Sequence, residues 1–281
     1  AFDSSHRPKR SLGQNFLVDK NLQRKIVDAL DPRPEDEILE IGPGKGALTH
    51  HILGRPRSLI LVELDDSLAA SWAAETADLP GVRLVHRDIL QVDLEELTAE
   101  VESLKVVGNI PYNITTPILF HLLQVPRPRE ILLMVQKEVG ERILASPGSS
   151  AFGALTVGVQ SIAGVQRVLR VPASAFRPVP AVDSVVLRIL PLRPEPLTAQ
   201  EEGDLRALTR MAFQQRRKQF QTILRNHPDT ALSHEQIAAL EALTGFDLKG
   251  RPENFSPGDF IQLSRALGEV ASGSEVGDPS P

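Results

Sequence analysis

The chain has 281 residues, 41% of them hydrophobic, which is enough for one large domain and a smaller one with ordinary buried cores. It has no cysteine, no apolar signal core at its start and no stretch near the roughly 18 apolar residues of a membrane span, so we expect a cytoplasmic protein without disulfides, thiolate-bound metal or a membrane partner. The net charge of −5 would disfavour binding to nucleic acid. However, residues 205–225 carry six Lys or Arg and no acidic residue, whereas residues 26–104 carry six Lys or Arg and 17 Asp or Glu, so the charges are segregated along the chain as one cationic face would require.

From residue 36 onward, short β-rich runs alternate with helical segments. Strands are expected at 37–41, 59–64, 82–86, 105–110 and 130–136. This alternation predicts a parallel sheet that is covered on both faces. After the fourth strand, Thr116 and Pro117 mark a helix start. Two late runs, 165–171 and 184–190, are expected to close the sheet as an antiparallel edge.

The sequence also predicts a second, helical domain. Three prolines within residues 191–197 indicate a linker, and the pattern beyond them has a helical period. Capping signals stand at 198–201 and at Ser256. We therefore expect a sheet domain with a basic N-terminal arm (1–193), a small all-helical domain (194–268) and a disordered polar tail (269–281).

A glycine-rich turn follows the first predicted strand. Gly42 and Gly44 would let backbone approach a ligand at the carboxyl edge of the sheet. Glu63 ends the second strand and can accept both hydroxyls of a ribose, and Asp88 follows the third and can accept from the exocyclic amine of a purine. All of these positions are expected to converge on one crevice.

Other interpretations of this turn remain open. Gly42, Gly44 and Ala47 also satisfy the looser fingerprint of an NAD site. The glycines alone would equally suit a tight turn, and Glu63 could belong to a helix-start cluster favoured by the helix dipole.

The segment Asn-Ile-Pro-Tyr at 109–112 favours a transferase that acts on a planar amine. The Asn109 side-chain carbonyl and the Ile110 backbone carbonyl can each accept one hydrogen of an amino group, which directs its lone pair at an electrophile. Pro111 stiffens the turn, and Tyr112, the chain's one tyrosine, can stack on the ring. A proline turn with a packed tyrosine is the alternative for these four residues taken alone.

Across residues 7–268 the chain resembles the ribosomal RNA adenine dimethyltransferases that use S-adenosylmethionine, and among them the bacterial small-subunit enzymes. The resemblance is carried by KRSLGQNFL (9–17), EIGPGKGALT (40–49), VELD (62–65), RDIL (87–90), GNIPYNITTPILFHLL (108–123), MVQKEVGERI (134–143), FRPVPAVDSVVLRI (176–189) and AFQQRRKQF (212–220). It implies a Rossmann-like class I methyltransferase sheet, mostly parallel with an antiparallel last strand, and a helical C-terminal domain.

The resemblance also implies roles for single residues. The cofactor, S-adenosylmethionine, would be held by Asn15, Leu17, Gly42, Gly44, Glu63, Asp88 and Asn109. The target adenine would lie between Tyr112 and Phe176, beside Asn109, Ile110 and Pro111, although Phe176 by itself would be assigned to the core. Lys9, Arg10, Arg216, Arg217 and Lys218 would bind RNA, the last three on one helical turn; a solvated helix face is the alternative for them.

The implied reaction is direct methyl transfer to an adenine that has been unstacked from its RNA, without a metal. The implied substrate is 16S rRNA in an immature small ribosomal subunit, modified at two adjacent adenosines of a hairpin near its 3′ end by a monomeric enzyme. Three alternatives stay open: a large-subunit (23S) RNA methyltransferase of the antibiotic-resistance type, a non-catalytic ribosome-assembly or transcription factor, and a DNA or protein-glutamine methyltransferase.

Overall fold

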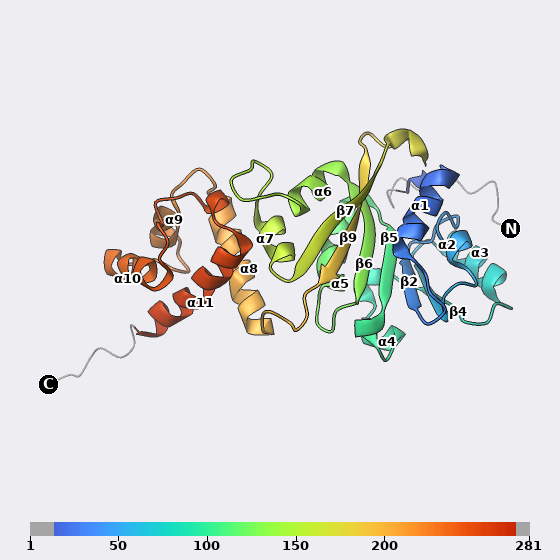
Figure 1. Cartoon of the computed structure of the whole chain (residues 1–281), viewed down its shortest axis with the longest axis horizontal. Coiled ribbons are helices and arrows are strands. Elements are labelled where there is room, and N and C mark those ends of the chain that lie inside the picture. The colour runs from blue at the N-terminus through green and yellow to red at the C-terminus, as the bar shows by residue number, and fades with distance from the viewer. Residues whose placement is uncertain (1–13, 274–281) are drawn as a thin grey trace. The chain divides into compact units, whose positions relative to one another are not determined.

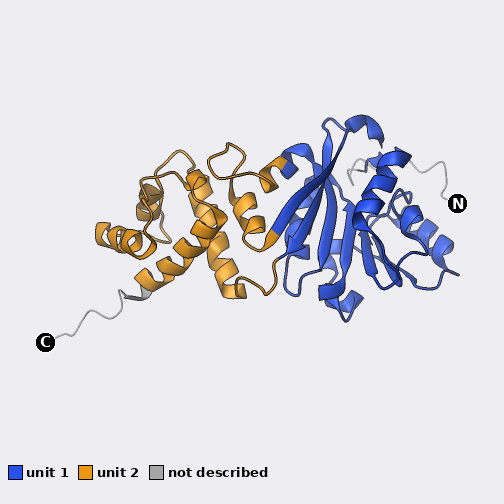
Figure 2. Cartoon of the chain, viewed as in Figure 1, with its two compact units in different colours: residues 1–140, 164–191 blue, residues 141–163, 192–281 orange. Residues whose placement is uncertain are grey.

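The computed structural model describes residues 14–273 and divides the chain into two compact units (Figure 1, Figure 2). Unit 1 comprises residues 1–140 and 164–191, and unit 2 comprises residues 141–163 and 192–281. The candidate residues Lys9 and Arg10 lie outside the described residues. No helix within 14–273 is both long enough and apolar enough to cross a membrane.

Unit 1 contains a seven-stranded sheet in the order β4-β3-β2-β5-β6-β9-β7 (Figure 1). Its strands are β2 (Glu37–Ile41), β3 (Ser58–Glu63), β4 (Val82–His86), β5 (Lys105–Asn109), β6 (Glu130–Gln136), β7 (Ala163–Val171) and β9 (Ser184–Pro191). Strands β2 to β6 pair in parallel, whereas β9 pairs antiparallel to β6. The expected mostly parallel sheet with an antiparallel late strand is confirmed.

Within the described part of unit 1, helix α1 (Lys20–Leu30) precedes β2, and four helices follow strands of the sheet: α2 (Thr49–Ile52), α3 (Asp66–Thr76), α4 (Leu94–Leu97) and α5 (Thr115–Leu122). A sixth, α6 (Lys137–Ile143), crosses the boundary between the units. Helix α5 begins at Thr115 with Ile114 as its N-cap, so the predicted start at Thr116 is wrong. The reason is that a helical turn at Tyr112–Ile114 leads directly into α5.

Apolar side chains cover both faces of the sheet. Successive residues of a strand point to opposite faces. On one face, Ile38 and Val107 join the buried cluster that contains Trp72 of α3. The neighbouring strand residues Leu39 and Val106 are fully buried and point to the other face. The central strands of the sheet are therefore buried on both sides, as their nearly continuous apolar sequences predict, whereas the edge strands β4 and β7 are only partly buried.

Unit 2 is helical and is held by phenylalanines. Its helices are α7 (Ala154–Gln160), α8 (Ala199–Gln214), α9 (Phe220–Asn226), α10 (His234–Thr244) and α11 (Pro257–Gly273). The Phe213 ring lies 6.0 Å from that of Phe152 and 5.6 Å from that of Phe260, measured between centroids. Because Phe152 packs here, residues 141–163 group with the C-terminal helices, whereas the sequence placed them in the sheet domain.

The capping signals of unit 2 occur where they were predicted. Thr198 and Glu201 form a capping box at the start of α8. Ser256 accepts a hydrogen bond of 3.1 Å from the Asp259 amide at the start of α11. Helix α11 continues to Gly273, so residues 269–273 are helical and do not belong to a disordered tail.

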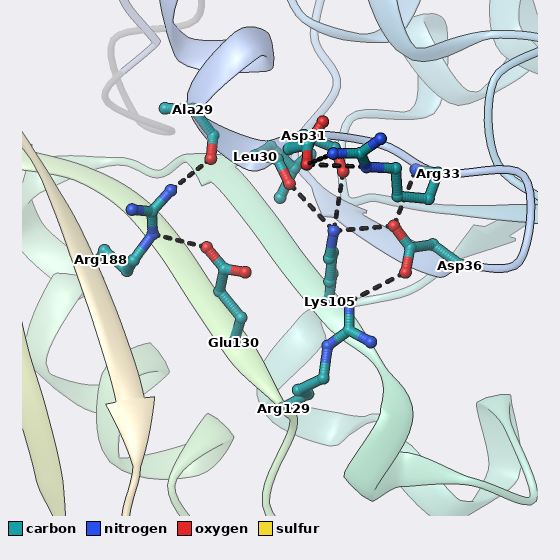
Figure 3. Close-up of polar contacts among 9 residues, drawn as sticks. All are labelled: Ala29, Leu30, Asp31, Arg33, Asp36, Lys105, Arg129, Glu130 and Arg188. Atoms are coloured by element: carbon teal, nitrogen blue, oxygen red, sulfur yellow. Dashed lines mark hydrogen bonds and ion pairs between the residues drawn. The ribbon is translucent and has the colours of Figure 1, made fainter.

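A buried lysine ties separate segments together at the amino edge of the sheet (Figure 3). Lys105, the first residue of β5, has a side chain only 5% exposed, with its Nζ 2.7 Å from Oδ2 of Asp36. The same ammonium donates to the carbonyls of Leu30 and Asp31 at 3.1 and 2.8 Å. It therefore joins the end of α1 to the loop before β2 and to the start of β5.

Asp36 is the acidic centre of this cluster. Arg129 also reaches it, with Nη2 2.9 Å from Oδ1. Burial alone would raise the pKa of the Asp36 carboxyl, but hydrogen bonds from Lys105 and the Arg33 amide, together with the nearby positive charges, hold the pKa below its usual value. The carboxyl is therefore charged at neutral pH.

Replacing Lys105 by Met should lower the free energy of unfolding by about 3 kcal/mol, because it removes one partner of a buried ion pair. The matched control is Arg33→Met, which removes an exposed pair with Asp31 and should cost less than about 1 kcal/mol. Urea denaturation of both variants measures the difference. Equal small losses would contradict the structural role of Lys105.

Candidate active site

A cavity of about 690 Å³ opens at the carboxyl ends of β2, β3 and β5. Its wall includes residues 14–18, 40–48, 62–64, 87–90 and 109–114. Its volume is within the range of about 300–1,000 Å³ that is typical of sites for small ligands and cofactors. Most of the predicted site residues line it: Asn15, Leu17, Gly42, Gly44, Glu63, Asp88, Asn109, Ile110, Pro111 and Tyr112.

The glycine-rich turn after β2 needs its glycines. Gly42 and Gly44 have φ angles of 62° and 57°, a region that other residues rarely adopt. A Cβ atom on Gly44 would lie 3.1 Å from the Phe16 ring. On its other side, Nε1 of Trp72 in α3 donates a 2.9 Å hydrogen bond to the Gly44 carbonyl. The turn is thus held in the shape that exposes its backbone to the cavity.

Glu63 ends β3 and is 5% exposed. Its Oε2 accepts from the Gly44 amide at 3.1 Å, and its Oε1 accepts from the amides of Leu64 and Asp65, both at 2.9 Å. Burial raises the pKa of this carboxyl, and the three amides oppose that shift. A carboxylate has about four acceptor positions, so Glu63 can still accept hydroxyls of a sugar.

Asp88 lies at the other side of the cavity, just after β4. It is the N-cap of the short helical turn Ile89–Gln91, where its Oδ1 accepts from the Leu90 amide at 3.0 Å. This bond fixes the orientation of the carboxylate at the cavity wall. The predicted bond from the amine of a planar ring to the second oxygen of Asp88 stays a prediction.

Asn109, the last residue of β5, binds the segment that precedes α1. Its Nδ2 donates to the Asn15 carbonyl at 3.1 Å, which directs the side-chain oxygen away from that contact as an acceptor. The same segment is held by a bond from Gln14 to Asp65 and by one from Gln23 to the Leu17 carbonyl. Residues 14–18 thus form a fixed wall of the cavity.

Tyr112 also lines the cavity, and its hydroxyl lies 2.7 Å from Oγ of Ser184. Burial raises the pKa of the phenol, and the bond to Ser184 only partly opposes this, so the side chain is neutral at physiological pH. Pro111 accepts from the Ile114 amide at 3.2 Å, which closes the turn that carries Tyr112.

Phe176 is separate from these residues. It pairs with Leu17 across the two-stranded sheet of β1 (Phe16–Leu17) and β8 (Phe176–Arg177), and its side chain is fully buried in the main apolar cluster. It does not line the cavity within the part of the chain that is described. Its contact explains how residues 14–18 are anchored, but it gives no support to the expected stacking on a target base.

Phe16, Lys45 and Glu40 are among the cavity residues that were not predicted as site residues from the sequence. The Lys45 ammonium lies 5.3 Å from the centroid of the Phe16 ring, a cation–π distance that links the glycine-rich turn to residues 14–18. The sequence signal for Phe16 and Lys45 was their position, because Phe16 lies between Asn15 and Leu17 and Lys45 follows Gly44. For Glu40 the signal was an acidic residue within a strand whose neighbours are apolar.

Glu40 is 2% exposed, and its Oε2 has no hydrogen-bond partner among residues 14–273. Burial is the main cause that raises its pKa to about 8; contacts with Thr49 oppose the shift, and the charge of Glu63 adds to it. This carboxyl is therefore largely protonated at neutral pH.

The basic triplet 216–218 lies in the turn between α8 and α9, so its expected position on a helix is corrected. Arg216 is engaged within unit 2: its Nη2 donates to the Ser150 carbonyl at 3.0 Å and to Glu253 at 3.1 Å. Arg217 and Lys218 are exposed. The chain just after the triplet pairs with the segment 249–251, because the Phe220 amide donates to the Gly250 carbonyl at 2.8 Å.

Comparison with known proteins gives consistent results. The family model for ribosomal RNA adenine dimethylase matches residues 5–262. A ribosomal RNA small subunit methyltransferase A from Geobacter metallireducens is 42% identical over 267 residues, which cover 93% of this chain and 96% of that one. One from Laribacter hongkongensis is 43% identical, covering 95% of this chain and 98% of its own.

Solved structures share the fold. A dimethyladenosine transferase from Plasmodium falciparum superposes with a TM-score of 0.76 at 24% identity, covering 91% of this chain and 98% of its own. A 23S rRNA methyltransferase superposes with a TM-score of 0.68 at 25% identity, covering 90% of this chain and 99% of its own.

The pKa of Glu40 predicts a specific pH dependence of stability. Because burial raises this pKa to about 8, the folded state binds more protons than the unfolded state above about pH 5. As the pH rises from about 5 to about 8, the free energy of unfolding therefore falls by up to about 1.4 kcal/mol per pH unit. Glu40→Gln should remove this loss, so its stability relative to the wild type should increase from about pH 5 to 8 in urea denaturation. Parallel pH profiles for the two proteins would refute the assignment.

Proposed function

The chain belongs to the ribosomal RNA adenine dimethylase family, and we propose that its cavity is where methyl groups are transferred from S-adenosylmethionine to adenines of small-subunit ribosomal RNA. One observation carries the proposal. The Asn-Ile-Pro-Tyr segment at the end of β5 opens on the same cavity as the glycine-rich turn, Glu63 and Asp88. The residues proposed to hold a nucleoside cofactor and those proposed to hold a planar amine therefore line one cavity.

The residues present fit S-adenosylmethionine. Glu63 would accept the ribose hydroxyls, and Asp88 would accept from the adenine amine. Gly42 and Gly44 have φ angles that other residues rarely adopt, so their turn can present its backbone to the ligand, and Phe16 of residues 14–18 packs against Gly44. The cofactor supplies the methyl group, carried on a positively charged sulfur. The protein's part is to bind, to orient and to exclude water.

The target amine would lie against Asn109 and Ile110. The Asn109 side-chain oxygen and the Ile110 carbonyl would each accept one of its hydrogens, which directs the nitrogen lone pair towards the methyl group. The bond from Asn109 to the Asn15 carbonyl keeps this amide in the required orientation. Tyr112 would stack on the adenine, with its ring held by Ser184. Catalysis then rests mainly on orientation in a site shielded from water.

The sequence relationship favours the small subunit as the source of the RNA. Relatives that are ribosomal RNA small subunit methyltransferase A are 42% and 43% identical to this chain, whereas the 23S rRNA methyltransferase is 25% identical. The proposed substrate is 16S rRNA in an immature small subunit, at two adjacent adenosines of a hairpin near the 3′ end. The enzyme would act as a monomer in the cytoplasm, where ribosomes assemble.

Unit 2 offers a basic surface for RNA. Arg217 and Lys218 are exposed, and the backbone pairing of Phe220 with Gly250 brings them beside a second exposed pair, Lys249 and Arg251. These four side chains, here called the basic patch, could contact neighbouring phosphates. Arg216 would support the patch from within, because Ser150 and Glu253 hold its guanidinium.

The reaction can be tested with labelled S-adenosylmethionine and, in separate assays, immature small subunits, large-subunit RNA and DNA. After digestion, dimethyladenosine should come from the small subunit alone. Asn109→Ala should bind the cofactor nearly as well as the wild type but lose more than about 100-fold in turnover, because the amine is no longer oriented. Label in large-subunit RNA would reassign the substrate, and near-normal turnover by the variant would exclude the proposed role of the amide.

The basic patch can be tested by replacing Arg217 and Lys218 with Ala. Binding to the small-subunit RNA should weaken, and the slope of log affinity against log salt should fall by about one for each phosphate contact that is lost. The matched control is Arg206→Ala, which removes a half-exposed charge of α8 that lies near Glu202. If the slope stays the same in the double variant, the RNA must bind elsewhere.

A further inference from the structure

Glu40 is a second buried carboxyl in the cavity wall, and it differs from Glu63 in how it is satisfied. Both oxygens of Glu63 accept backbone amides. In Glu40, by contrast, Oε2 has no hydrogen-bond partner among the described residues, although the residue is only 2% exposed. A buried carboxylate with one oxygen unpartnered is costly, so this position favours the neutral acid unless a positive charge comes close.

The strands beside Glu40 supply no such charge. Opposite it lie Leu61 on β3 and Val107 on β5, which are both apolar. The charged group on these strands that acts on Glu40 is Glu63, whose negative charge raises the pKa of Glu40 further. Two acids thus share one wall of the cavity.

The surrounding helices and turn add polar groups that are engaged elsewhere. Thr49 of α2 lies against the Glu40 carboxyl. His50 and His51 follow it, and each ring contacts a side chain of a neighbouring helix, at 3.0 and 3.3 Å. Lys20 and Lys45 also line the cavity, and the Lys45 ammonium lies over the Phe16 ring. Among the charged side chains that the structure describes, only Glu63 contributes to the raised pKa of Glu40, through the repulsion between the two carboxylates.

We infer that Glu40 is a further cofactor-binding residue that carries a proton in the free protein and releases it when the positively charged methyl donor binds beside it. The proton passes to the solvent, and no other bond forms or breaks. Ionised Glu40 then provides the counter-charge for the sulfonium. This inference rests on the proposed function, since it requires that S-adenosylmethionine occupies this cavity.

The inferred proton release gives the site a means to distinguish donor from product. S-adenosylmethionine and S-adenosylhomocysteine share the ribose, the adenine and the amino acid group, but only the donor has a charged sulfur. Once the methyl group is transferred, the charge that stabilised ionised Glu40 is gone. Glu40 then regains a proton, and the product is held less tightly than the donor at the same pH.

The test is calorimetric titration of both ligands into the full-length protein at about pH 7, in buffers with different ionisation enthalpies. The wild type should release more protons with S-adenosylmethionine than with S-adenosylhomocysteine, by a large fraction of one proton. In Glu40→Gln the two ligands should release the same number. Protons released by the amino group that both ligands share, or by Glu63, cancel in the comparison with S-adenosylhomocysteine. The matched control variant is Glu37→Gln, on the same strand, which should behave as the wild type.

Affinity provides a second readout. Between about pH 6 and 7, the preference of the wild type for the charged ligand should grow by up to about tenfold per pH unit, and the preference of Glu40→Gln should stay constant. Should that variant fail to fold, infrared difference spectra of the wild type must show the loss of a protonated carboxyl on binding the donor.

Three results would overturn the inference while leaving the proposed function standing: equal proton release with the two ligands, a difference that persists in Glu40→Gln, or no carboxyl change in the infrared spectra. If neither ligand binds the wild-type protein, the proposed function fails and the role of Glu40 fails with it.

Discussion

The ammonium group of Lys105 sets the geometry on which the cavity depends. Lys105 begins the five-residue strand β5 and holds the end of α1 through the carbonyls of Leu30 and Asp31. The same strand ends at Asn109, whose amide holds the Asn15 carbonyl before α1 begins. One strand therefore fixes both ends of the segment 15–31. Because residues 14–18 form a wall of the cavity, the buried contacts at the amino edge of the sheet position a wall at its carboxyl edge.

The two edges of the sheet treat buried acids in opposite ways. At the amino edge, cations hold Asp36 in its charged form, which stabilises the fold. At the carboxyl edge, burial raises the pKa of both Glu40 and Glu63, and no positive charge of residues 14–273 lowers either pKa. A positively charged ligand beside Glu40 and Glu63 would therefore stabilise the charged form of these two acids. This arrangement agrees with a cofactor that carries a positive charge next to its reactive carbon.

The sequence predicted those site residues that follow a parallel strand. Gly42, Glu63, Asp88 and Asn109 each stand at or just after a strand end, and parallel pairing brings such ends to one edge. Contacts between distant segments could not be predicted in this way. Phe176 is buried because β8 pairs with β1, about 160 residues earlier in the chain, and an aromatic residue alone does not indicate which partner it will meet.

Contacts between distant segments also explain why the structure of unit 2 differs from the prediction. The helical period around residues 216–218 is interrupted because the following residues pair with Gly250, which lies far ahead in the chain. Residues 141–163 belong with the C-terminal helices because Phe152 packs on Phe213.

The hydrogen bond from Trp72 to the Gly44 carbonyl has an optical consequence. Trp72 is the single tryptophan of the chain, it is fully buried, and its indole donates a hydrogen bond to the turn that lines the cavity. Its fluorescence therefore arises from one defined environment and responds to displacement of that turn. The unlabelled protein thus carries its own spectroscopic reporter, which contacts the turn without being one of the residues that line the cavity.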